Sequence, residues 1–355
     1  MKRVHFIGID VHCQFCEIAV LNAAGKVVLR DRCDTTIPAL AEVLKTIPRP
    51  RRVVIEEGPM AGWLCRNLHP EVDTMVVSEP RRNRLIAKEG DKDDDLDAEK
   101  LALLYRGGFI KEVHQVGSLE QAVFKQQVAL YHHRVRQRVR EAHRITHLFR
   151  QHGIVIREKS YVAEKERPAL LAQLPANGTL PELFKWTWTS YDGLVEQEEK
   201  WRQRLVQVAK EVQMVQRFEE LPGIGWIRAA TLYAYLDTPW RFRSKEALWK
   251  YLGIGLERKR SGNGPEFLGV PRRTHRLLKC TILGAAKSAI AQGDNPFADL
   301  YRRWVEQGLS PKLARRNVAR RLAATLWGLW KNSSAYHPDW VGVAAAASAA
   351  VQVSR

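Results

Sequence analysis

The chain has 355 residues, 45% of them hydrophobic and 27% charged, which indicates a globular protein of two or three domains and excludes a fibrous or wholly disordered one. It has no stretch of 18 apolar residues, so we expect no membrane-spanning segment, and no signal-peptide core follows Met1. Its five cysteines are unevenly spaced, which is typical of a reducing compartment. We therefore expect a cytoplasmic protein without membrane contact.

The formal net charge of +18 favours a polyanionic partner, either nucleic acid or an anionic membrane. Residues 1–110 carry 17 basic and 17 acidic side chains, and residues 111–240 carry 19 and 15. Residues 241–331 carry 20 and 6, so they hold most of the positive excess. We expect this C-terminal third to bind phosphates.

The first 110 residues alternate between strand and helix patterns. Runs of β-branched residues predict a buried strand at 4–10 and a hairpin of strands at 17–21 and 27–29, with Gly25 near the end of the turn. A predicted helix at 35–46, strands at 52–56 and 74–77, and a helix at 91–105 follow. This order predicts an α/β domain with a mixed sheet over residues 1–115.

Four acidic residues of this domain form a candidate metal site. Asp10 and Glu56 each end a predicted strand, and Asp94 and Asp97 share one face of the helix at 91–105. Leu101 lies on the same face, which could pack on the sheet. Four converging carboxylates would repel one another, and hard oxygen ligands suit Mg²⁺, which in two-metal sites activates phosphodiester chemistry.

Other assignments are open within this region. Each acid taken alone could be a solvated cap, Asp93 and Asp97 would share a helix face equally well, and Glu57 competes with Glu56. Cys13 and Cys16 have the spacing of a zinc pair, but no second pair of ligands stands at a suitable distance in the sequence. The pattern therefore favours Mg²⁺ over zinc.

The middle of the chain, residues 116–218, reads as a basic helical arm. A helix is predicted at 119–151, which contains no Pro or Gly, and a second at 194–218, with a connection at 168–188 that holds Trp186 and Trp188. Two long helices joined by a loop suggest an antiparallel coiled coil that dimerises, although a plain helical bundle fits equally well. Arg134 and Arg138 are candidate phosphate contacts in either case.

The last domain, predicted at 219–340, opens with Leu-Pro-Gly-Ile-Gly at 221–225. This pattern resembles a helix-hairpin-helix turn, in which Gly223 and Gly225 would let the backbone approach a phosphate. An ordinary helix connection is the alternative. Residues 341–355 are rich in Ala and Ser and are predicted to form a flexible tail.

Ser261 has an unusual setting in this domain. It follows three basic residues and precedes two glycines within four positions, so the basic side chains could hold a phosphodiester against its hydroxyl. Most Ser-Gly pairs in such loops are only turns. The candidate phosphate contacts here and further along are Arg258, Lys259, Arg260, Arg272, Arg273, Arg276, Arg315 and Arg316.

The order of five motifs resembles the insertion-sequence 110 family, the DEDD transposases, over nearly the whole chain. The motifs are Gly-Ile-Asp at 8–10, Ile-Glu at 55–56, Asp-x-x-Asp-Ala at 94–98, Leu-Pro-Gly-Ile-Gly at 221–225 and Arg-Ser-Gly at 260–262. Two departures follow the last motif. Asn263-Gly264-Pro265 replaces further small hydroxyl residues, and Val270–Arg273 replaces a commoner Lys-Gly turn.

The resemblance implies an N-terminal RuvC-like domain with a ribonuclease H fold, a coiled-coil arm and a mainly helical C-terminal transposase domain. It implies that Asp10, Glu56, Asp94 and Asp97 hold Mg²⁺ and that Ser261 attacks DNA to form a phosphoserine link. It also implies a bacterial or archaeal protein whose dimers pair into a tetramer, and an element-encoded guide RNA that pairs with donor and target DNA.

Two other functions fit the same residues. A RuvC-like nuclease or junction resolvase would cut DNA with metal-activated water, and Ser261 would then be structural. A nucleic-acid-binding protein without catalysis would need no metal. The presence of all four acids counts against this last alternative.

Overall fold

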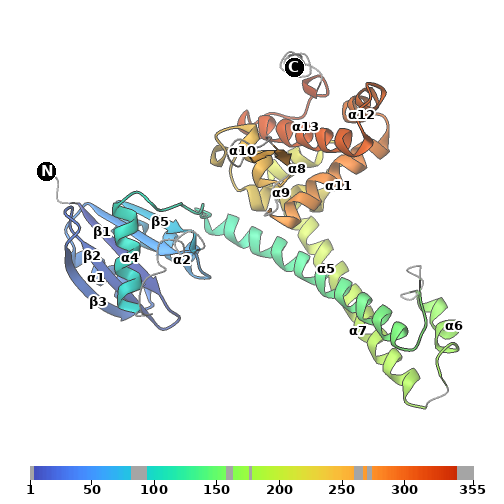
Figure 1. The fold of residues 1–355 in the computed structure, drawn as a ribbon, viewed down its shortest axis with the longest axis horizontal. Coiled ribbons are helices and arrows are strands. Elements are labelled where there is room, and N and C mark those ends of the chain that lie inside the picture. Colours follow the sequence, from blue (N-terminus) through green and yellow to red (C-terminus); the bar gives the residue numbers. More distant parts are fainter. Residues whose placement is uncertain are drawn as a thin grey trace. The chain divides into compact units, whose positions relative to one another are not determined.

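The computed structural model describes residues 4–80, 94–156, 163–175, 178–259, 267–269 and 274–341. The chain divides into two compact units, residues 1–122 and 123–355 (Figure 1). The predicted tail, 341–355, lies outside the described residues except for Val341. Among the described residues, no helix is both long and apolar enough to cross a membrane.

The N-terminal unit is built on a mixed five-stranded sheet, as predicted. Its strands lie in the order β3-β2-β1-β4-β5, where β1 pairs antiparallel with β2 and parallel with β4. The strand bounds are β1 His5–Val11, β2 Phe15–Leu21, β3 Val27–Asp34, β4 Arg51–Glu56 and β5 Thr74–Ser78. The third strand extends five residues beyond the predicted 27–29, because its polar half pairs with β2 at the edge of the sheet.

The two faces of the sheet are covered differently. Helices α1, Ile37–Thr46, and α2, Ala61–Leu68, share an apolar core with the face that carries Ile7, Ile9 and Ile55. Helix α4, Asp94–Arg106, packs on the opposite face against β1, β2 and β4 (Figure 1). The sequence reading did not predict α2, which has only eight residues and no side-chain cap.

Helix α4 lies unusually close to β1 at Gly8. A Cβ atom added at Gly8 would overlap the carbonyl oxygen of Ala98 and lie 2.8 Å from the backbone nitrogen of Ala102. Ala98 and Ala102 are themselves buried and small. The glycine and the two alanines therefore set how near the helix backbone comes to the sheet.

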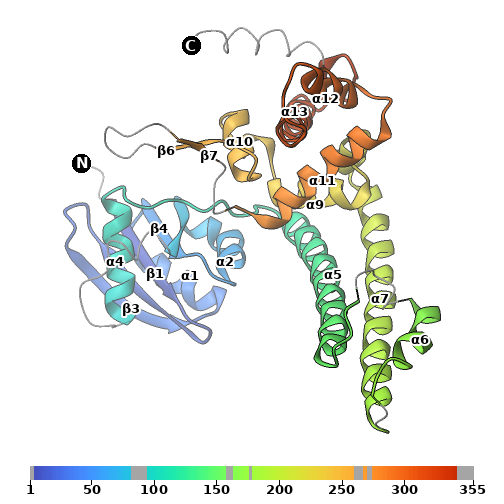
Figure 2. The ribbon, with the colours of Figure 1, turned by 45° about the vertical axis from the view of Figure 1, so that its right-hand side comes forward.

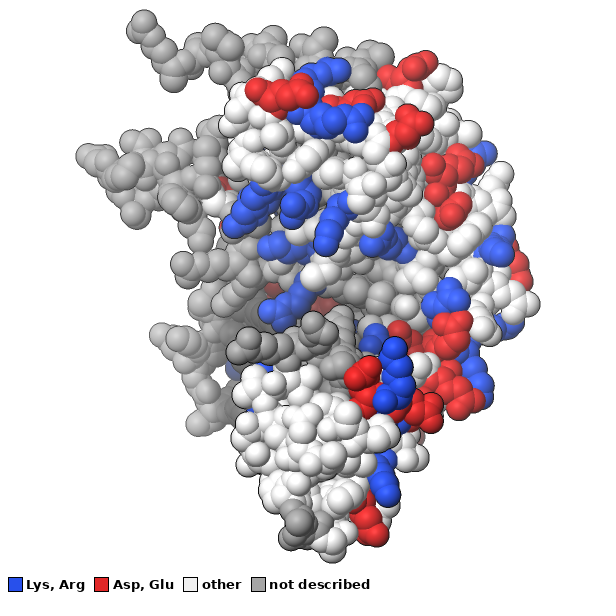
Figure 3. Space-filling model, turned by 90° about the vertical axis from the view of Figure 1, so that its right-hand side faces the viewer, with Lys and Arg blue, Asp and Glu red and all other residues white. Residues whose placement is uncertain are grey.

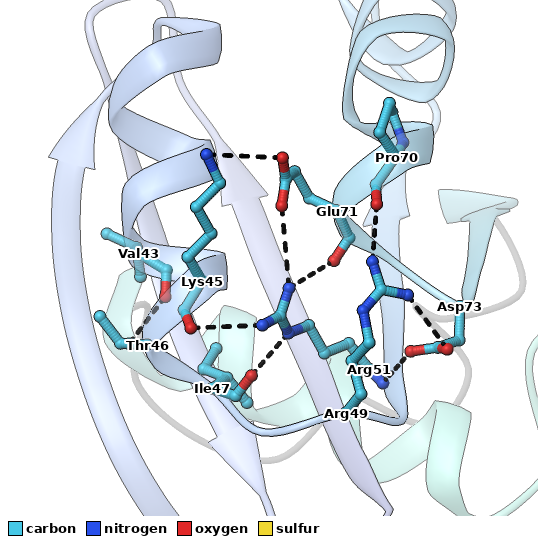
Figure 4. A network of polar contacts seen from close by, with 9 residues as sticks. All are labelled: Val43, Lys45, Thr46, Ile47, Arg49, Arg51, Pro70, Glu71 and Asp73. Carbon is cyan, nitrogen blue, oxygen red and sulfur yellow. Dashed lines mark hydrogen bonds and ion pairs between the residues drawn. The ribbon is translucent and has the colours of Figure 1, made fainter.

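The buried Arg51 links the chain segments at the end of the sheet where β4 and β5 begin. The Arg51 guanidinium donates to the carbonyl oxygens of Ile47, Glu71 and Lys45, and its backbone N–H donates to Asp73 Oδ2 at 2.7 Å (Figure 4). This hydrogen bond is the main cause of the lowered pKa of the Asp73 carboxyl. Arg51 thus joins the end of α1 to the turn η1, His69–Glu71, and to the start of β4.

The C-terminal unit begins with the predicted arm. Helix α5, Leu119–Gln151, has the predicted bounds, and α7, Leu180–Glu211, runs in the opposite direction beside it (Figures 1 and 2). Arg138 of α5 contacts Glu198 of α7, and further along α5 Phe149 contacts Phe184, which lies earlier in α7. This pairing is antiparallel.

The predicted bounds of the second arm helix were wrong. It begins at Leu180 instead of residue 194, because Pro181 lies in the first turn, where its missing N–H does no harm. Trp186 and Trp188 therefore lie on a helix. An extended residue at Val212 ends α7 and separates it from α8, Gln213–Glu219. The short helix α6, Arg167–Leu171, precedes α7.

The arm has two separate cores. Its far end packs Ile145 and Phe149 of α5 against Phe184 and Trp188 of α7. Its near end shares a larger core with the C-terminal helices, so both belong to one compact unit. The remaining elements are α9 Trp226–Leu236, η4 Pro239–Arg241, α10 Lys245–Tyr251, β6 Glu257–Lys259, β7 Phe267–Gly269, α11 Arg276–Gln292, α12 Pro296–Glu306 and α13 Pro311–Lys331.

Replacing Gly8 with Ala should lower the stability of the N-terminal unit, because the new methyl group would overlap backbone atoms of α4, which cannot move aside as a flexible side chain can. We expect the free energy of unfolding to fall by about 2 kcal/mol in urea titrations. The control is Gly58→Ala, since a Cβ atom at Gly58 meets nothing within 4 Å. Equal stability of the two variants would contradict a tight contact at Gly8.

Gly223→Ala should destabilise the C-terminal unit more than Gly293→Ala. Both glycines have φ of +80°, so both substitutions carry a backbone strain of roughly 1 kcal/mol. Only at Gly223 would the Cβ atom also overlap the carbonyl oxygen of Ala285 in α11. Thermal unfolding of the two variants measures the difference, and identical midpoints would refute the packing role.

Candidate active site

Asp10 and Glu56 lie on neighbouring strands, at the end of the sheet where the parallel strands β1 and β4 both finish. Ile9 of β1 is the parallel partner of Ile55 of β4, so the next residue of each strand occupies a neighbouring position. Ile9 and Ile55 are buried in the core under α1 and α2. Because side chains alternate along a strand, Asp10 and Glu56 belong to the face covered by α4.

Helix α4 runs antiparallel to β1, which places its first turn near these acids. The Tyr105 ring, at the end of the helix, contacts Phe6 at the start of β1, with centroids 5.9 Å apart, and Ala98 lies against Gly8. From Gly8 to Asp10 the strand advances by the length of about four helix residues. This places the backbone at the start of α4 level with Asp10.

Of the helix face predicted to pack on the sheet, Leu101 is buried, together with Ala98 beside it. Asp97 lies at the margin of this face, 53% exposed, and one carboxylate oxygen is 3.4 Å from Lys100 Nζ. Asp94 begins α4, but its side chain lies outside the described residues. Within the described residues, no three acidic, histidine or cysteine side chains are close enough to hold a metal ion.

The described donors nevertheless suit a hard cation. Asp10 and Glu56 supply carboxylate oxygens from neighbouring strands, and no sulfur ligand stands among them. Mg²⁺ is bound by one or two carboxylates together with water and phosphate oxygens. The residues present therefore fit Mg²⁺ better than a metal that prefers thiolates.

Two further residues of this site were missed by the sequence reading. Glu17 of β2 is the antiparallel partner of Asp10, and its carboxylate is buried, 3.4 Å from Arg32 Nε. His12 Nε2 is 3.2 Å from Asp10 Oδ2. The signal for Glu17 was an acid inside an otherwise apolar strand, but only the register of the hairpin shows that it faces Asp10.

The two cysteines near this site, Cys13 and Cys16, differ in burial. Cys16 is buried in the core, where its Sγ lies 3.5 Å from the Thr35 hydroxyl, and burial raises the pKa of its thiol. Cys13 is exposed. A thiol with a raised pKa is a poor metal ligand at neutral pH.

Ser261 lies outside the described residues, together with Arg260, Arg272 and Arg273. The side chains of Arg258 and Lys259 are likewise not described, although their backbone forms β6. Strand β6 pairs antiparallel with β7, so residues 260–266 connect the two strands of a hairpin (Figure 2).

The root of this hairpin is firmly held. Ile254 is fully buried, and its carbonyl oxygen accepts a hydrogen bond of 2.8 Å from Arg320 Nε of α13. The Gly255 backbone N–H donates to the Trp249 carbonyl oxygen of α10. The segment that leads to Ser261 therefore leaves the helical core from a fixed point.

The two glycines of the Leu-Pro-Gly-Ile-Gly turn have different surroundings. Gly223 is buried against α11, and its carbonyl oxygen accepts from Arg228 Nη1, which also contacts Ser288 Oγ. Gly225 is exposed as the N-cap of α9, and a Cβ atom there would meet nothing within 4 Å. Only Gly225 offers its backbone to solvent.

The predicted arginine contacts also differ in their surroundings. Arg138 donates to Glu198 at 2.6 Å, an ion pair that raises the pKa of the guanidinium and joins the arm helices, while Arg134 donates to Gln137. Arg276 and Arg315 are exposed on α11 and α13, and Arg316 is half-buried. Figure 3 shows Lys and Arg gathered without acids on part of the helical body, whereas both signs mix elsewhere on that face.

Comparisons with known proteins agree with this layout. A model of DEDD transposases of the insertion-sequence 110 type matches residues 7–154, and one of the IS116/IS110/IS902 transposase family matches residues 215–302. The transposase for insertion sequence element IS1111A of Coxiella burnetii is 22% identical over 95% of this chain and 92% of its own length. A protein of Sinorhizobium fredii named as a transposase is 24% identical over 95% of the chain and 86% of its own length.

The first matched segment contains the paired strand ends and α4, and the second contains the glycine turn and the β6–β7 hairpin. The acids and the hairpin that we singled out thus lie inside the matched segments. The chain belongs to the insertion-sequence 110 family of transposases, enzymes that act on DNA.

Proposed function

We propose that this transposase is an RNA-guided DNA recombinase that cuts and rejoins donor and target DNA through a covalent phosphoserine intermediate. The observation that carries the proposal is the placement of Asp10 and Glu56 on neighbouring parallel strands beneath the acidic first turn of α4. The strand order, with β1 central and β2 antiparallel, supports a RuvC-like domain of ribonuclease H fold.

Asp10, Glu56, Asp94 and Asp97 would hold Mg²⁺ in this proposal. When bound, Mg²⁺ would offset the negative charge of the phosphodiester. Asp10 and Glu56 lie on neighbouring strands, and His12 beside Asp10 restricts how that carboxylate can turn. Glu17 of β2, buried next to Asp10, pairs with the exposed Arg32 of β3 and adds a charge-paired acid beside the proposed site.

Ser261 would be the nucleophile. Its Oγ would form a bond to phosphorus as the bond between phosphorus and one sugar oxygen breaks, so the hydroxyl proton leaves and the freed sugar oxygen gains one. Attack by the sugar hydroxyl of another strand reverses these steps and joins the new ends. Because the number of phosphoester bonds is conserved, the reaction needs no external energy source.

Base pairing of a guide RNA encoded by the element would select donor and target DNA, and the protein would contact the backbone. Arg276 and Arg315, exposed on the basic helical body, support backbone contacts of this kind. We propose a dimer held by the arm of α5 and α7 that pairs into a tetramer. The cytoplasm is the expected compartment.

A covalent-trapping assay tests the serine. Protein, guide RNA, Mg²⁺ and labelled DNA are mixed, quenched in denaturant and separated by size. We expect an adduct between protein and DNA that Ser261→Ala abolishes, because alanine has no nucleophilic oxygen. Ser190→Ala, which removes an exposed hydroxyl from α7, should leave the adduct unchanged. Cleaved DNA without any adduct would instead indicate hydrolysis by a RuvC-like nuclease.

Asp10→Asn should abolish strand exchange while leaving RNA binding intact, because the substitution removes one carboxylate from the site and no charge from the C-terminal unit. It should also reduce the stabilisation that Mg²⁺ or Mn²⁺ gives to thermal unfolding of the protein. Asp31→Asn, on an exposed position of β3, is the matched control. Full exchange activity in the Asp10 variant would refute the role of this carboxylate.

A further inference from the structure

Two tryptophans and a lysine meet where η4 packs on the end of α13, and the sequence analysis singled out none of them. Lys331 Nζ lies 4.2 Å from the centre of the Trp327 ring and 5.1 Å from the centre of the Trp240 ring. Trp327 and Lys331 belong to α13, and Trp240 belongs to η4. We name these three residues the Trp240–Lys331 stack.

The two rings of the stack have different surroundings. Trp327 is partly buried against the core, and its Nε1 donates to the Pro239 carbonyl oxygen at 2.8 Å, which ties η4 to α13. The Trp240 ring, next in the chain, is 71% exposed. Tryptophan is highly buried on average, so a ring held on a fixed turn and left this open is unusual. Trp327 therefore anchors the turn, and Trp240 is presented to solvent.

The lysine gives this exposed ring a positive neighbour. The described contacts of Lys331 Nζ are with the two rings, and no carboxylate among the described residues pairs with it. An aromatic face accepts a nucleobase by stacking, and a cation beside it can bind the adjoining phosphate. The stack thus combines the two contacts that single-stranded nucleic acid needs.

The same face of α13 continues toward the β6–β7 hairpin. Arg316, Arg320, Trp327 and Lys331 are separated by four, seven and four residues, which places them on one side of the helix. Arg320 lies roughly 10 Å along the helix from Trp327. Its Nε donates to the carbonyl oxygen of Ile254, at the root of the hairpin.

This face is positively charged over its length. Burial is the main reason that the pKa of Arg320 is lowered, and the charge of Arg316 lowers it further. A cation that is partly buried beside another cation has a field that a bound anion would relieve. A nucleic acid strand that approached the hairpin along α13 would therefore meet both the cations and the exposed ring.

We propose that Trp240 stacks on an unpaired base of an RNA strand and that Lys331 binds a phosphate beside that base. RNA is the favoured occupant because the bases of duplex DNA are stacked inside the double helix, whereas the loops of a folded RNA leave bases open to aromatic side chains. The proposal rests on the proposed function and deepens it, because it assigns contacts with RNA to residues outside the nucleophile loop.

Fluorescence anisotropy with the full-length protein tests the stack. Three labelled probes are titrated at several salt concentrations: an RNA hairpin with an unpaired loop, a blunt RNA duplex of the same stem, and a single-stranded DNA of the loop sequence. The variants are Trp240→Ala, Trp240→Phe and Lys331→Met. Trp340→Ala, which removes another exposed tryptophan ring, is the matched control.

We expect Trp240→Ala to weaken binding of the hairpin on the order of tenfold, as the loss of one stacked base does, and to leave the blunt duplex unaffected. Trp240→Phe should keep most of the affinity, because a smaller ring still stacks. Lys331→Met should weaken binding of the hairpin and reduce the slope of log affinity against log salt by about one. Trp340→Ala should match the unsubstituted protein, and thermal unfolding checks that each variant is folded.

Photocrosslinking gives a second measurement that needs no variant. A hairpin with 5-bromouridine in its loop is irradiated on the unsubstituted protein, and the linked peptide is identified by mass spectrometry. We expect the crosslink at Trp240, because the bromouracil ring would lie directly on the indole.

Unchanged affinity of Trp240→Ala for the hairpin, or crosslinks that all lie elsewhere, would overturn the stack while leaving the proposed recombinase intact. An equal loss for the blunt duplex or in Trp340→Ala would also overturn it, because the effect would then not depend on an unpaired base or on this ring. A loss seen only with single-stranded DNA would overturn the assignment to RNA. If the unsubstituted protein bound neither RNA probe, the proposed RNA-guided function itself would fail, and the stack with it.

Discussion

The contact between α4 and β1 at Gly8 is the constraint on which the N-terminal unit depends. It involves no acid, yet it fixes the level of α4 along the strand that carries Asp10, because a helix packed backbone to backbone on one strand can neither slide nor rise without losing the contact. Two polar contacts also hold α4 on the sheet. Arg106, at the C-terminal end of the helix, donates to the Ala23 carbonyl oxygen, and Glu99 pairs with Arg30 of β3.

The C-terminal unit contains a second close contact between a glycine and a helix backbone. Gly223 lies against Ala285 and Ala289 of α11 as closely as Gly8 lies against Ala98 and Ala102 of α4. In both places a glycine faces two alanines that lie one helical turn apart. The backbones can come this close because few side-chain atoms lie between them. At Gly223 this packing fixes the turn that precedes α9. Both units therefore contain a close backbone contact that only residues with little or no side chain permit.

The sequence predicted the parts of this structure that depend on local pattern. The five strands, α1, α4 and α5 have strong periodicity or a clear cap, and they were found. The start of α7 was missed because Pro181 and the tryptophans near it resemble a connection until packing against Phe149 is known. Asp10 and Glu56 could be paired from their strand-end positions, whereas Glu17 required the register of the hairpin.

The separation of charge between the units follows from the chemistry that each is suited to. A cluster of carboxylates repels phosphate until a cation is present, so a large positive excess in the same unit would pair with those acids and compete with the metal. Residues 1–110 carry equal numbers of basic and acidic side chains, and the excess lies in residues 241–331, in a unit with its own core. The proposed metal ligands and the cations proposed to bind phosphates would then coexist in one chain without neutralising each other. The equal numbers of basic and acidic side chains in residues 1–110 would therefore limit the cations that compete with Mg²⁺ for the proposed ligands Asp10 and Glu56.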